Sequence, residues 1–486
     1  MVRRFAEMLG LFLIILLIAS PDGHAQQAAA VAAPARALAP VNLGTLPAEA
    51  QTWLADLIRI DTTNPPGNEL AAANYVAGVL RKESINTEVL ELAPGRGVVV
   101  ARLQAGALPD PSRALLLVGH LDVVGVDPTK WTVNAFSGAV KDGYIYGRGA
   151  IDDKGMVSAN LAAFVALKRA GVRLNRDVIF LADADEEEAG TANIRAVIDK
   201  YWDKIACAFA LNEGGRVLMT TDGKTQYVGV QASEKVAYNV TVSATGVAGH
   251  ASVPRPDNAV VHLAAAIEKI AAYRPPAQPT TITRRYFERL ATIEDEDTAR
   301  SMRALETPQR LELAAGRLSD MSPVWSSMLR DSVTPTELHA GIRANVVPSE
   351  ARATLNVRLL PSNTIEPLIA QLQKAVNDPQ IRFTVAPGRG ISAPSSSTES
   401  ELFQTIERLV PQQFPGAIVV PFLSTSATDS AELRLRNVQA LGLMPFPLTE
   451  ADEQHVHGDD ERLSLASFHT GVDFLYRIVY EFSAAK

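Results

Sequence analysis

The sequence predicts an α/β fold in which a mixed β-sheet is covered by helices on both faces. Three short, almost entirely apolar runs indicate strands buried on both sides, at residues 114–118, 177–182 and 206–211. Helical spacing lies between such runs, as in residues 156–170, and strands that alternate with helices build a helix-covered sheet. The chain has 486 residues and is 47% apolar, which is enough for two packed domains.

The N-terminus has the pattern of a secretory signal peptide. A basic start is followed by an apolar run over residues 9–19 and by small residues that end at Ala25. Because this run is short for a membrane span, we predict a signal peptide over residues 1–25, cleavage after Ala25 and a secreted or periplasmic protein without stable membrane insertion. An uncleaved signal that anchors the protein is the alternative. Residues 26–47 are predicted to be a flexible leader, and the single cysteine, Cys207, excludes an intrachain disulfide.

A histidine and an aspartate follow the first predicted strand. His120 would lie at the C-terminal end of that strand, where open α/β sheets bind ligands, and Asp122 shares its face. A carboxylate beside a ligating histidine can accept its other ring N–H and fix the tautomer. The turn at residues 147–149 can project Asp152 toward His120. Taken alone, these residues also fit a strand-end histidine with ordinary turn acids, so a metal site requires further ligands.

Further ligand candidates follow in order along the chain. The second strand leads into residues 183–188, where acids crowd together and repel one another unless a cation or solvent takes up the charge. The third strand is followed by Glu213, and His455 and His457 lie near the C-terminus. Oxygen and imidazole ligands without thiolates suit zinc, cobalt or manganese, and a shared carboxylate suits two metals about 3.5–4 Å apart. For the acidic run alone, a solvated loop is the alternative.

These motifs resemble the two-zinc amidohydrolase and metallopeptidase family that contains acetylornithine deacetylase, succinyl-diaminopimelate desuccinylase, aminoacylase and carboxypeptidase G. The string TTNPPGNE at residues 62–69 and the stretch over residues 131–155 are most similar to its carboxypeptidase S branch. The resemblance runs from about residue 48 to the C-terminus. It implies a hydrolase with two Zn²⁺ ions per chain, for which Co²⁺ or Mn²⁺ are the alternatives.

The resemblance also implies a role for each residue of the motifs. The metal ligands would be His120 and Glu213 for one metal, Glu187 and His457 for the other, and Asp152 as the bridge. Glu186 would be the general base, and Asp122 the carboxylate that orients His120. A water between two metals has its pKa pulled toward neutrality, so Glu186 would take its proton as the metal-bridged hydroxide attacks an amide carbonyl.

Two alternatives remain among these residues. The extra acid Glu188 permits a slip of one residue, in which Glu187 is the base and Glu188 the ligand. Counting from the preceding strand favours Glu186 and Glu187. His455 competes with His457, but His457 has the family's spacing to the acid that follows it.

The pattern of buried apolar strands that alternate with helices changes from about residue 233. An alternating strand at residues 237–242 is followed by helical spacing over 262–267 and by two further predicted strands, at 342–347 and 353–359. This resembles the inserted α+β lid or dimerisation domain of the family, a sheet with helices on one face. The implied lid covers residues 233–387, and it divides the catalytic domain into an N-terminal segment over residues 48–232 and a C-terminal segment over 388–486.

The lid also carries candidate substrate contacts. The resemblance implies a homodimer formed through the lid, in which His250 stabilises the oxyanion, often in the partner subunit's site. Asn345 and Arg358 look like the residues that hold the substrate carboxylate, and the planar fork of arginine pairs bidentately with such a group. Residues 283–336 exceed a minimal lid, and we expect an amphipathic helical insertion that packs on the lid rather than a substrate gate. Residues 424–430 resemble the family's Thr-Asp-Ser loop near the substrate.

Two functions of different classes remain. The first is a secreted zinc-dependent hydrolase that cleaves a peptide or N-acyl amide next to a free carboxylate, with a small peptide or an N-acyl amino acid as substrate. The alternative is a catalytically silent binding or assembly protein with the same fold. The complete set of ligands and the base favours catalysis. The formal charge of −8, with no basic stripe, gives no support for nucleic-acid binding.

Overall fold

The first described helix starts slightly earlier than the sequence predicts. The predicted signal peptide, residues 1–25, and the predicted leader before residue 43 lie outside the described residues. Helix α1 (Leu46–Arg59) begins within the last two residues of that leader, because Pro47 and Glu49 in its first turn favour helix initiation. None of the described helices combines the length and apolar character needed to span a bilayer. The computed structural model describes residues 43–188, 190–388 and 390–485.

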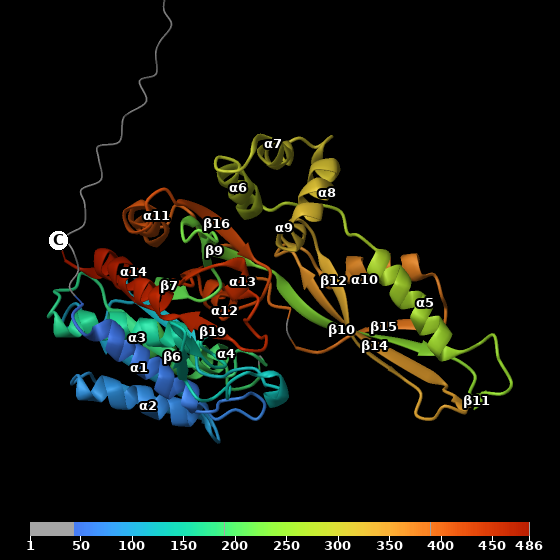
Figure 1. The fold of residues 1–486 in the computed structure, drawn as a ribbon, viewed down its shortest axis with the longest axis horizontal. Coiled ribbons are helices and arrows are strands. Elements are labelled where there is room, and N and C mark those ends of the chain that lie inside the picture. The colour runs from blue at the N-terminus through green and yellow to red at the C-terminus, as the bar shows by residue number, and fades with distance from the viewer. Residues whose placement is uncertain (1–42, 189, 389, 486) are drawn as a thin grey trace, which may run out of the picture. The chain divides into compact units, whose positions relative to one another are not determined.

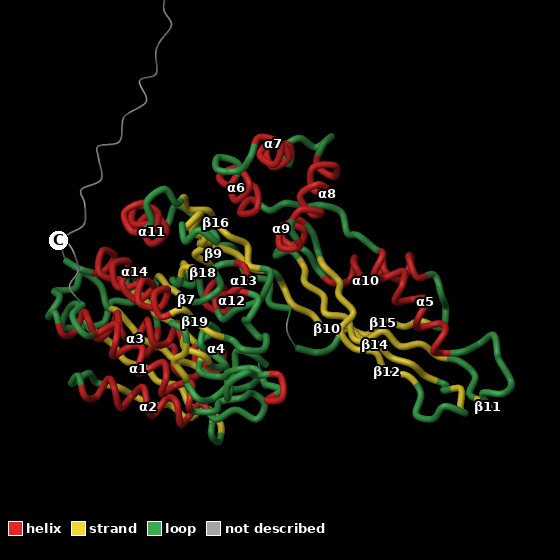
Figure 2. Tube along the Cα trace, viewed as in Figure 1, coloured by secondary structure: helices red, strands yellow, loops and turns green. Residues whose placement is uncertain are grey.

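A mixed ten-stranded sheet forms the core of the predicted catalytic domain (Figures 1 and 2). Its strands are β1 (Thr87–Ala93), β2 (Arg96–Leu103), β3 (Leu115–His120), β6 (Val178–Asp183), β7 (Phe209–Asn212), β8 (Arg216–Met219), β9 (Thr225–Glu234), β16 (Ile418–Ser424), β17 (Gln439–Gly442) and β18 (Pro447–Leu448). They pair in the order β1-β2-β6-β3-β7-β17-β9-β8-β18, and β16 pairs with β9. Because β3 is parallel to β6 and β7 while β1 and β2 are antiparallel, the predicted mixed sheet is confirmed.

Helices cover both faces of this sheet. They are α1, α2 (Glu69–Lys82), α3 (Lys154–Arg169), α4 (Ile194–Ile205), α11 (Glu401–Gln413), α12 (Ser430–Leu435) and α14 (Leu465–Ser483). Helices α1, α3 and α14 pack on one another against one face (Figure 1). On the other face, Val197 of α4 and Leu433 of α12 are buried with Val118 of β3. A small sheet and two short helices complete the domain. They are β4 (Ala139–Lys141), β5 (Tyr144–Tyr146), β19 (Arg462–Ser464), η1 (Pro128–Lys130) and α13 (Glu450–Glu453).

The three apolar runs of the sequence form β3, β6 and β7. All six residues of β3 and all six of β6 are buried, as expected for parallel strands covered on both faces. Since β3 lies between β6 and β7 and is parallel to both, the three strands end at the same edge of the sheet. The residues after these strands are therefore neighbours in space.

The lid is a four-stranded antiparallel sheet with helices on one face, as the resemblance implies. Its elements are β10 (Val236–Thr245), β12 (Ser332–Ala340), β14 (Glu350–Leu359), β15 (Ile381–Val385), α5 (Ala259–Ala272) and α10 (Ile365–Val376), with the pair β11 (Gly249–His250) and β13 (Val346–Val347). Leu263 of α5 and Leu368 of α10 are buried with Val240 of β10. Lys235 alone joins β9 of the large sheet to β10 of the lid, slightly beyond the predicted boundary at residue 233.

One predicted lid strand is largely wrong. Of residues 342–347, only Val346 and Val347 form a strand, and the residues before them form a turn. Gly341 has a φ of 67°, which favours glycine and reverses the chain after β12. Ile342 is 94% exposed at this turn, so its apolar side chain was misleading as a strand signal.

The insertion within the lid is mainly helical, but its first helix does not pack as predicted. Its helices are α6 (Thr281–Leu290), α7 (Glu296–Ala304), α8 (Leu311–Met321) and α9 (Pro323–Leu329). Helix α6 packs on β16 of the large sheet, where the ring of Tyr286 lies 6.1 Å from that of Tyr227 and 5.9 Å from that of Phe422. Arg289 of the same helix forms an ion pair of 2.6 Å with Glu407 of α11. The expectation that this insertion packs on the lid is therefore wrong for α6, whose aromatic face is buried against the large sheet, whereas residues 332–336 of the predicted insertion belong to lid strand β12.

Candidate metal centre

The topology of the large sheet brings the predicted ligands to one edge. β3 ends at His120, β6 leads into the acidic turn at residues 185–187, and β7 ends just before Glu213. One donor atom each from His120, Glu186 and Glu213 lies within 4.8 Å of the others. Residues that are far apart in the sequence thus converge where parallel strands end.

Asp152 lies between two histidines that are far apart in the sequence, His120 and His457. Its Oδ1 is 3.0 Å from His120 Nε2, and its Oδ2 is 3.1 Å from His457 Nε2. His457 Nε2 is also 3.1 Å from Glu187 Oε1. Contact with Asp152, and then with Glu187, raises the pKa of His457 to about 10. A carboxylate whose two oxygens face two imidazoles has the arrangement that a metal-bridging ligand requires.

The donor set fits divalent cations. Donor atoms of His120, Asp152 and Glu187 lie within 4.8 Å of one another, as do those of Asp152, Asp153 and Glu213. Burial raises the pKa of Glu213, and the nearby carboxylate of Asp152 raises it further. Carboxylates crowded in this way are stabilised when bound cations offset their charge, and imidazole and oxygen donors suit zinc, cobalt or manganese. The groups share residues, so the division of the ligands between two metals stays a prediction.

Asp122 contacts both His120 and the acidic turn. The Nδ1 of His120 is 3.0 Å from the backbone oxygen of Asp122 and 3.4 Å from its carboxylate. The same carboxylate accepts the backbone N–H groups of Glu186 and Glu187, each at 3.2 Å. Although burial raises the pKa of Asp122, its hydrogen bond with His120 lowers it below the usual value. Asp122 thus fixes the orientation of the imidazole and the position of the two acids together.

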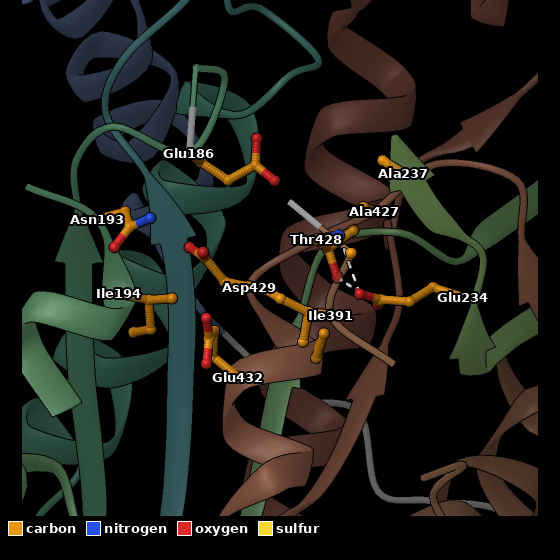
Figure 3. A pocket seen from close by; sticks show the side chains of 12 residues that line it. Glu186, Asn193, Ile194, Glu234, Ala237, Ile391, Ala427, Thr428, Asp429 and Glu432 are labelled. Atoms are coloured by element: carbon orange, nitrogen blue, oxygen red, sulfur yellow. Dashed lines mark hydrogen bonds between the residues drawn. The ribbon is translucent and has the colours of Figure 1, made fainter. Parts of the chain in front are cut away.

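Glu186 lines a small cavity of about 60 Å³ beside the ligands (Figure 3). Burial raises its pKa, and the neighbouring carboxylates of Asp429 and Glu187 raise it further. Thr428 and Asp429 line the same cavity, which places the predicted Thr-Asp-Ser loop next to Glu186. A buried carboxyl group with a raised pKa, at the edge of a cavity, has the properties expected of a general base.

The two candidate ligand pairs left open by the sequence differ in their contacts. Glu187 contacts His457, whereas Glu188 is exposed to solvent. The Nδ1 of His455 lies 2.8 Å from the backbone oxygen of Asp459. His455 and Glu188 belong to none of the described groups of potential ligands. The arrangement therefore favours Glu187 and His457 as ligands, with Glu186 as the base.

Glu461 has a role at this centre that the sequence did not predict. Its buried carboxylate accepts hydrogen bonds from Arg148 Nη1 at 2.8 Å and from the backbone N–H groups of Gly149, Ile151 and Asp152 at 3.2, 2.8 and 3.1 Å. The loop that carries Asp152 is therefore wrapped around an acid located just after His457. The only signal in the sequence was the spacing between His457 and this acid.

The predicted substrate contacts of the lid lie at two opposite ends of its sheet. In the β10–β14 register, Arg358 pairs with Ala237, which lines the Glu186 cavity. The Nε of Arg358 donates to Asn356 Oδ1 at 3.0 Å. His250 and Asn345 lie beyond the opposite end of β10, a strand about 30 Å long at roughly 3.3 Å per residue.

His250 and Asn345 share one corner of the lid. The backbone N–H of Ala251 donates to Asn345 O, and His250 Nδ1 lies 2.7 Å from Ser252 Oγ. Within the described residues, no hydrogen bond or ion pair joins either side chain to the candidate ligands. The chain thus brings Arg358 toward its own centre but does not bring His250 or Asn345 there.

Comparison with known proteins identifies the family. The family model for peptidase family M20/M25/M40 matches residues 116–481. The chain is 32% identical to a probable carboxypeptidase S-like 2 of Dictyostelium discoideum, over 76% of this chain and 72% of that protein. It is 28% identical to the human N-fatty-acyl-amino acid synthase/hydrolase PM20D1, over 76% of this chain and 74% of that protein.

Solved structures show the same fold. A metallo-carboxypeptidase of the M20 family from Sulfolobus solfataricus superposes with a TM-score of 0.67 and 18% identity, covering 89% of this chain and 99% of that one. Human carnosine dipeptidase 1 superposes with a TM-score of 0.64 and 15% identity, covering 91% and 99%. The expected family, with its carboxypeptidase S branch, is therefore confirmed. The chain belongs to peptidase family M20/M25/M40 and is a hydrolase.

Proposed function

We propose that this chain is a two-zinc hydrolase that cleaves an amide bond, either peptide or N-acyl, next to a free carboxylate. The observation that carries the proposal is the position of Asp152 between His120 and His457, with Glu186 close by. The relatives include a carboxypeptidase S-like protein and an N-fatty-acyl-amino acid synthase/hydrolase. Their names support a small peptide or an N-acyl amino acid as the substrate.

Five side chains would hold the metals. His120 and Glu213 would bind the first, Glu187 and His457 the second, and Asp152 would bind both. Zinc is proposed because the motifs resemble a two-zinc family, and Co²⁺ or Mn²⁺ would fit the same ligands. When bound, the ions polarise the scissile carbonyl and acidify the attacking water.

Glu186 would move the proton. Its carboxylate accepts a proton from the attacking water and then donates it to the leaving nitrogen, and a pKa raised by burial suits both steps. Asp122 contributes by holding His120 and the backbone of Glu186 in one arrangement.

A substrate panel tests the proposal. Purified, zinc-loaded protein is incubated with dipeptides, N-acyl amino acids and folate-like conjugates, with and without a chelator. We expect chelator-sensitive hydrolysis of substrates that have a carboxylate next to the amide. If no member of the panel is cleaved, the hydrolase proposal fails and a catalytically silent binding protein is the better description.

Arg358 would bind the substrate carboxylate together with Asn345 of the partner subunit, because Asn345 lies at the end of the lid away from the centre of its own chain. We expect Arg358→Ala to raise KM for carboxylate substrates about 10- to 100-fold, the effect of losing a charge-assisted bidentate pair. The corresponding amides should show little change. Arg352→Ala is the matched control, because Arg352 is an exposed arginine on the same strand. Equal effects on carboxylates and amides would reject this role.

His250 would act across a homodimer formed through the lid, since it lies far from the centre of its own chain. Mixing His250→Ala chains with Glu186→Gln chains should restore activity to about a quarter of wild type, because half of the dimers are mixed and each has one complete site. Each variant alone should be inactive. Absence of recovery in demonstrated heterodimers would contradict action across the dimer.

The chain would act outside the cytoplasm. The pattern of residues 1–25 supports a cleaved signal peptide, which leaves a mature chain that starts at Gln26 and has no stable membrane insertion. Anchoring by an uncleaved signal is the alternative. N-terminal sequencing of the exported protein distinguishes them.

A further inference from the structure

Residues 62–69, the string TTNPPGNE, run alongside the segment that follows β3. Thr62 Oγ1 donates to the backbone oxygen of Leu121 at 2.6 Å. The backbone N–H of Asn64 donates to Val123 O at 2.9 Å, and Val123 N donates to Thr62 O at 3.2 Å. This backbone pairing fixes residues 62–64 directly beside Asp122.

The side chain of Asn64 joins two buried carboxylates. Its Nδ2 donates to Asp122 Oδ2 and to Asp185 Oδ1, both at 2.9 Å. Asn64 is 4% exposed, and Asp122 and Asp185 are 0% and 3% exposed. A primary amide offers two hydrogens without a charge of its own, so it can satisfy both acids. An aspartate in its place would add a third negative charge to the same buried space.

Asp185, the second acceptor of the Asn64 side chain, makes further contacts of its own. Its carboxylate also contacts Arg96 Nη2 at 2.9 Å and accepts the backbone N–H of Ala192 at 3.0 Å. Arg96 is held in turn by two hydrogen bonds of 2.6 Å to Glu69, at the end of the TTNPPGNE string. The φ of Asp185 is 63°, a conformation that is costly for residues other than glycine unless the surroundings stabilise it. These contacts therefore set the path of the chain into Glu186.

We propose that Asn64 is a positioning residue for the acidic turn at residues 185–187. Asp122 accepts the backbone N–H groups of Glu186 and Glu187 from one side, and Asp185 begins the turn on the other. Asn64 is the side chain that hydrogen-bonds to both of these acids. It acts through them on the placement of the base and of a metal ligand. This inference rests on the proposed metal centre.

Zinc binding measures this role without reference to any substrate. Metal-free Asn64→Ala protein is titrated with zinc alone, and we expect one of the two zinc equivalents to bind about 10- to 100-fold more weakly, the usual effect of losing a partner that orients a ligand. Wherever a substrate is cleaved, kcat should fall by a similar factor while KM stays unchanged. Asn68→Ala is the matched control, because Asn68 is an exposed asparagine in the same string. It should bind both zinc equivalents as the wild type does.

Wild-type zinc affinity and kcat in folded Asn64→Ala would overturn the inference, whatever the change in thermal stability. Should that variant fail to fold, Asn64→Ser keeps one donor in a smaller side chain and should show an intermediate loss of zinc affinity. Wild-type affinity in Asn64→Ser would then overturn it. Failure of the hydrolase proposal has a different signature, since two zinc ions would bind tightly to the wild type without hydrolysis of any substrate.

Discussion

Replacing Glu186 by glutamine is expected to lower kcat by about 100- to 10,000-fold, which is the range contributed by a positioned general base. Glutamine keeps the shape of the side chain and loses the oxygen that accepts a proton. The metal content should stay near two per chain, since the proposed ligands are untouched. Turnover is measured on the best substrate of the panel, and metal content by elemental analysis of the same protein.

Glu188→Gln is the matched control for this change. Glu188 is an exposed acid in the same run, so its replacement should leave both turnover and metal content unchanged. Turnover retained by Glu186→Gln, combined with loss of turnover but full metal content in Glu187→Gln and loss of one metal from Glu188→Gln, would instead support the register shifted by one residue. The pair of measurements therefore distinguishes the base from the ligand.

Replacing Asp152 by asparagine should have the broadest effect on the centre. Its two oxygens face His120 and His457, so we expect both metals to bind more weakly, by more than the roughly 10- to 100-fold typical of residues that only orient a ligand. Zinc titration of the metal-free protein checks this. Asp459→Asn, which changes an exposed acid near His457, should retain wild-type affinity for both metals.

The same variant has a second readout in the absence of metal. Contact with Asp152 is the largest cause of the raised pKa of His457, which is about 10. Removing the carboxylate removes the charge that stabilises the imidazolium, so the pKa of His457 should fall toward its ordinary value. NMR titration of metal-free protein follows this change. An unchanged pKa would show that Asp152 does not hold His457 as the structure indicates.

Local patterns explain which features the sequence could predict. β3 and β6 are apolar up to Val118 and Ala182, because parallel strands covered on both faces bury every side chain. The residues after such strands are brought together by topology, so His120 and Glu213 could be proposed from position alone. The strand expected at residues 342–347 failed because an exposed turn can also carry apolar residues.

The features that the sequence could not predict depend on contacts between distant segments of the chain. Glu461 accepts hydrogen bonds from a loop 309 to 313 residues earlier in the chain, and no local periodicity records such a partner. Asn64 donates a hydrogen bond to Asp185, which lies 121 residues later in the chain, so the sequence pattern could not predict this donor role either. The position of helix α6 depended on Tyr286 finding aromatic partners on β9 and β16, which amphipathic spacing alone does not specify.

The contact between Glu461 and the Asp152 loop has a consequence for biosynthesis. A nascent chain synthesised as far as Glu213 already contains four of the five proposed ligands, but neither His457 nor the acid that holds Asp152 in place. The lid must be made and the C-terminal segment must return to the first half before the centre is complete. A polypeptide terminated before Glu461 therefore lacks a finished centre however well its first half folds, and synthesis through this residue becomes a condition for hydrolysis.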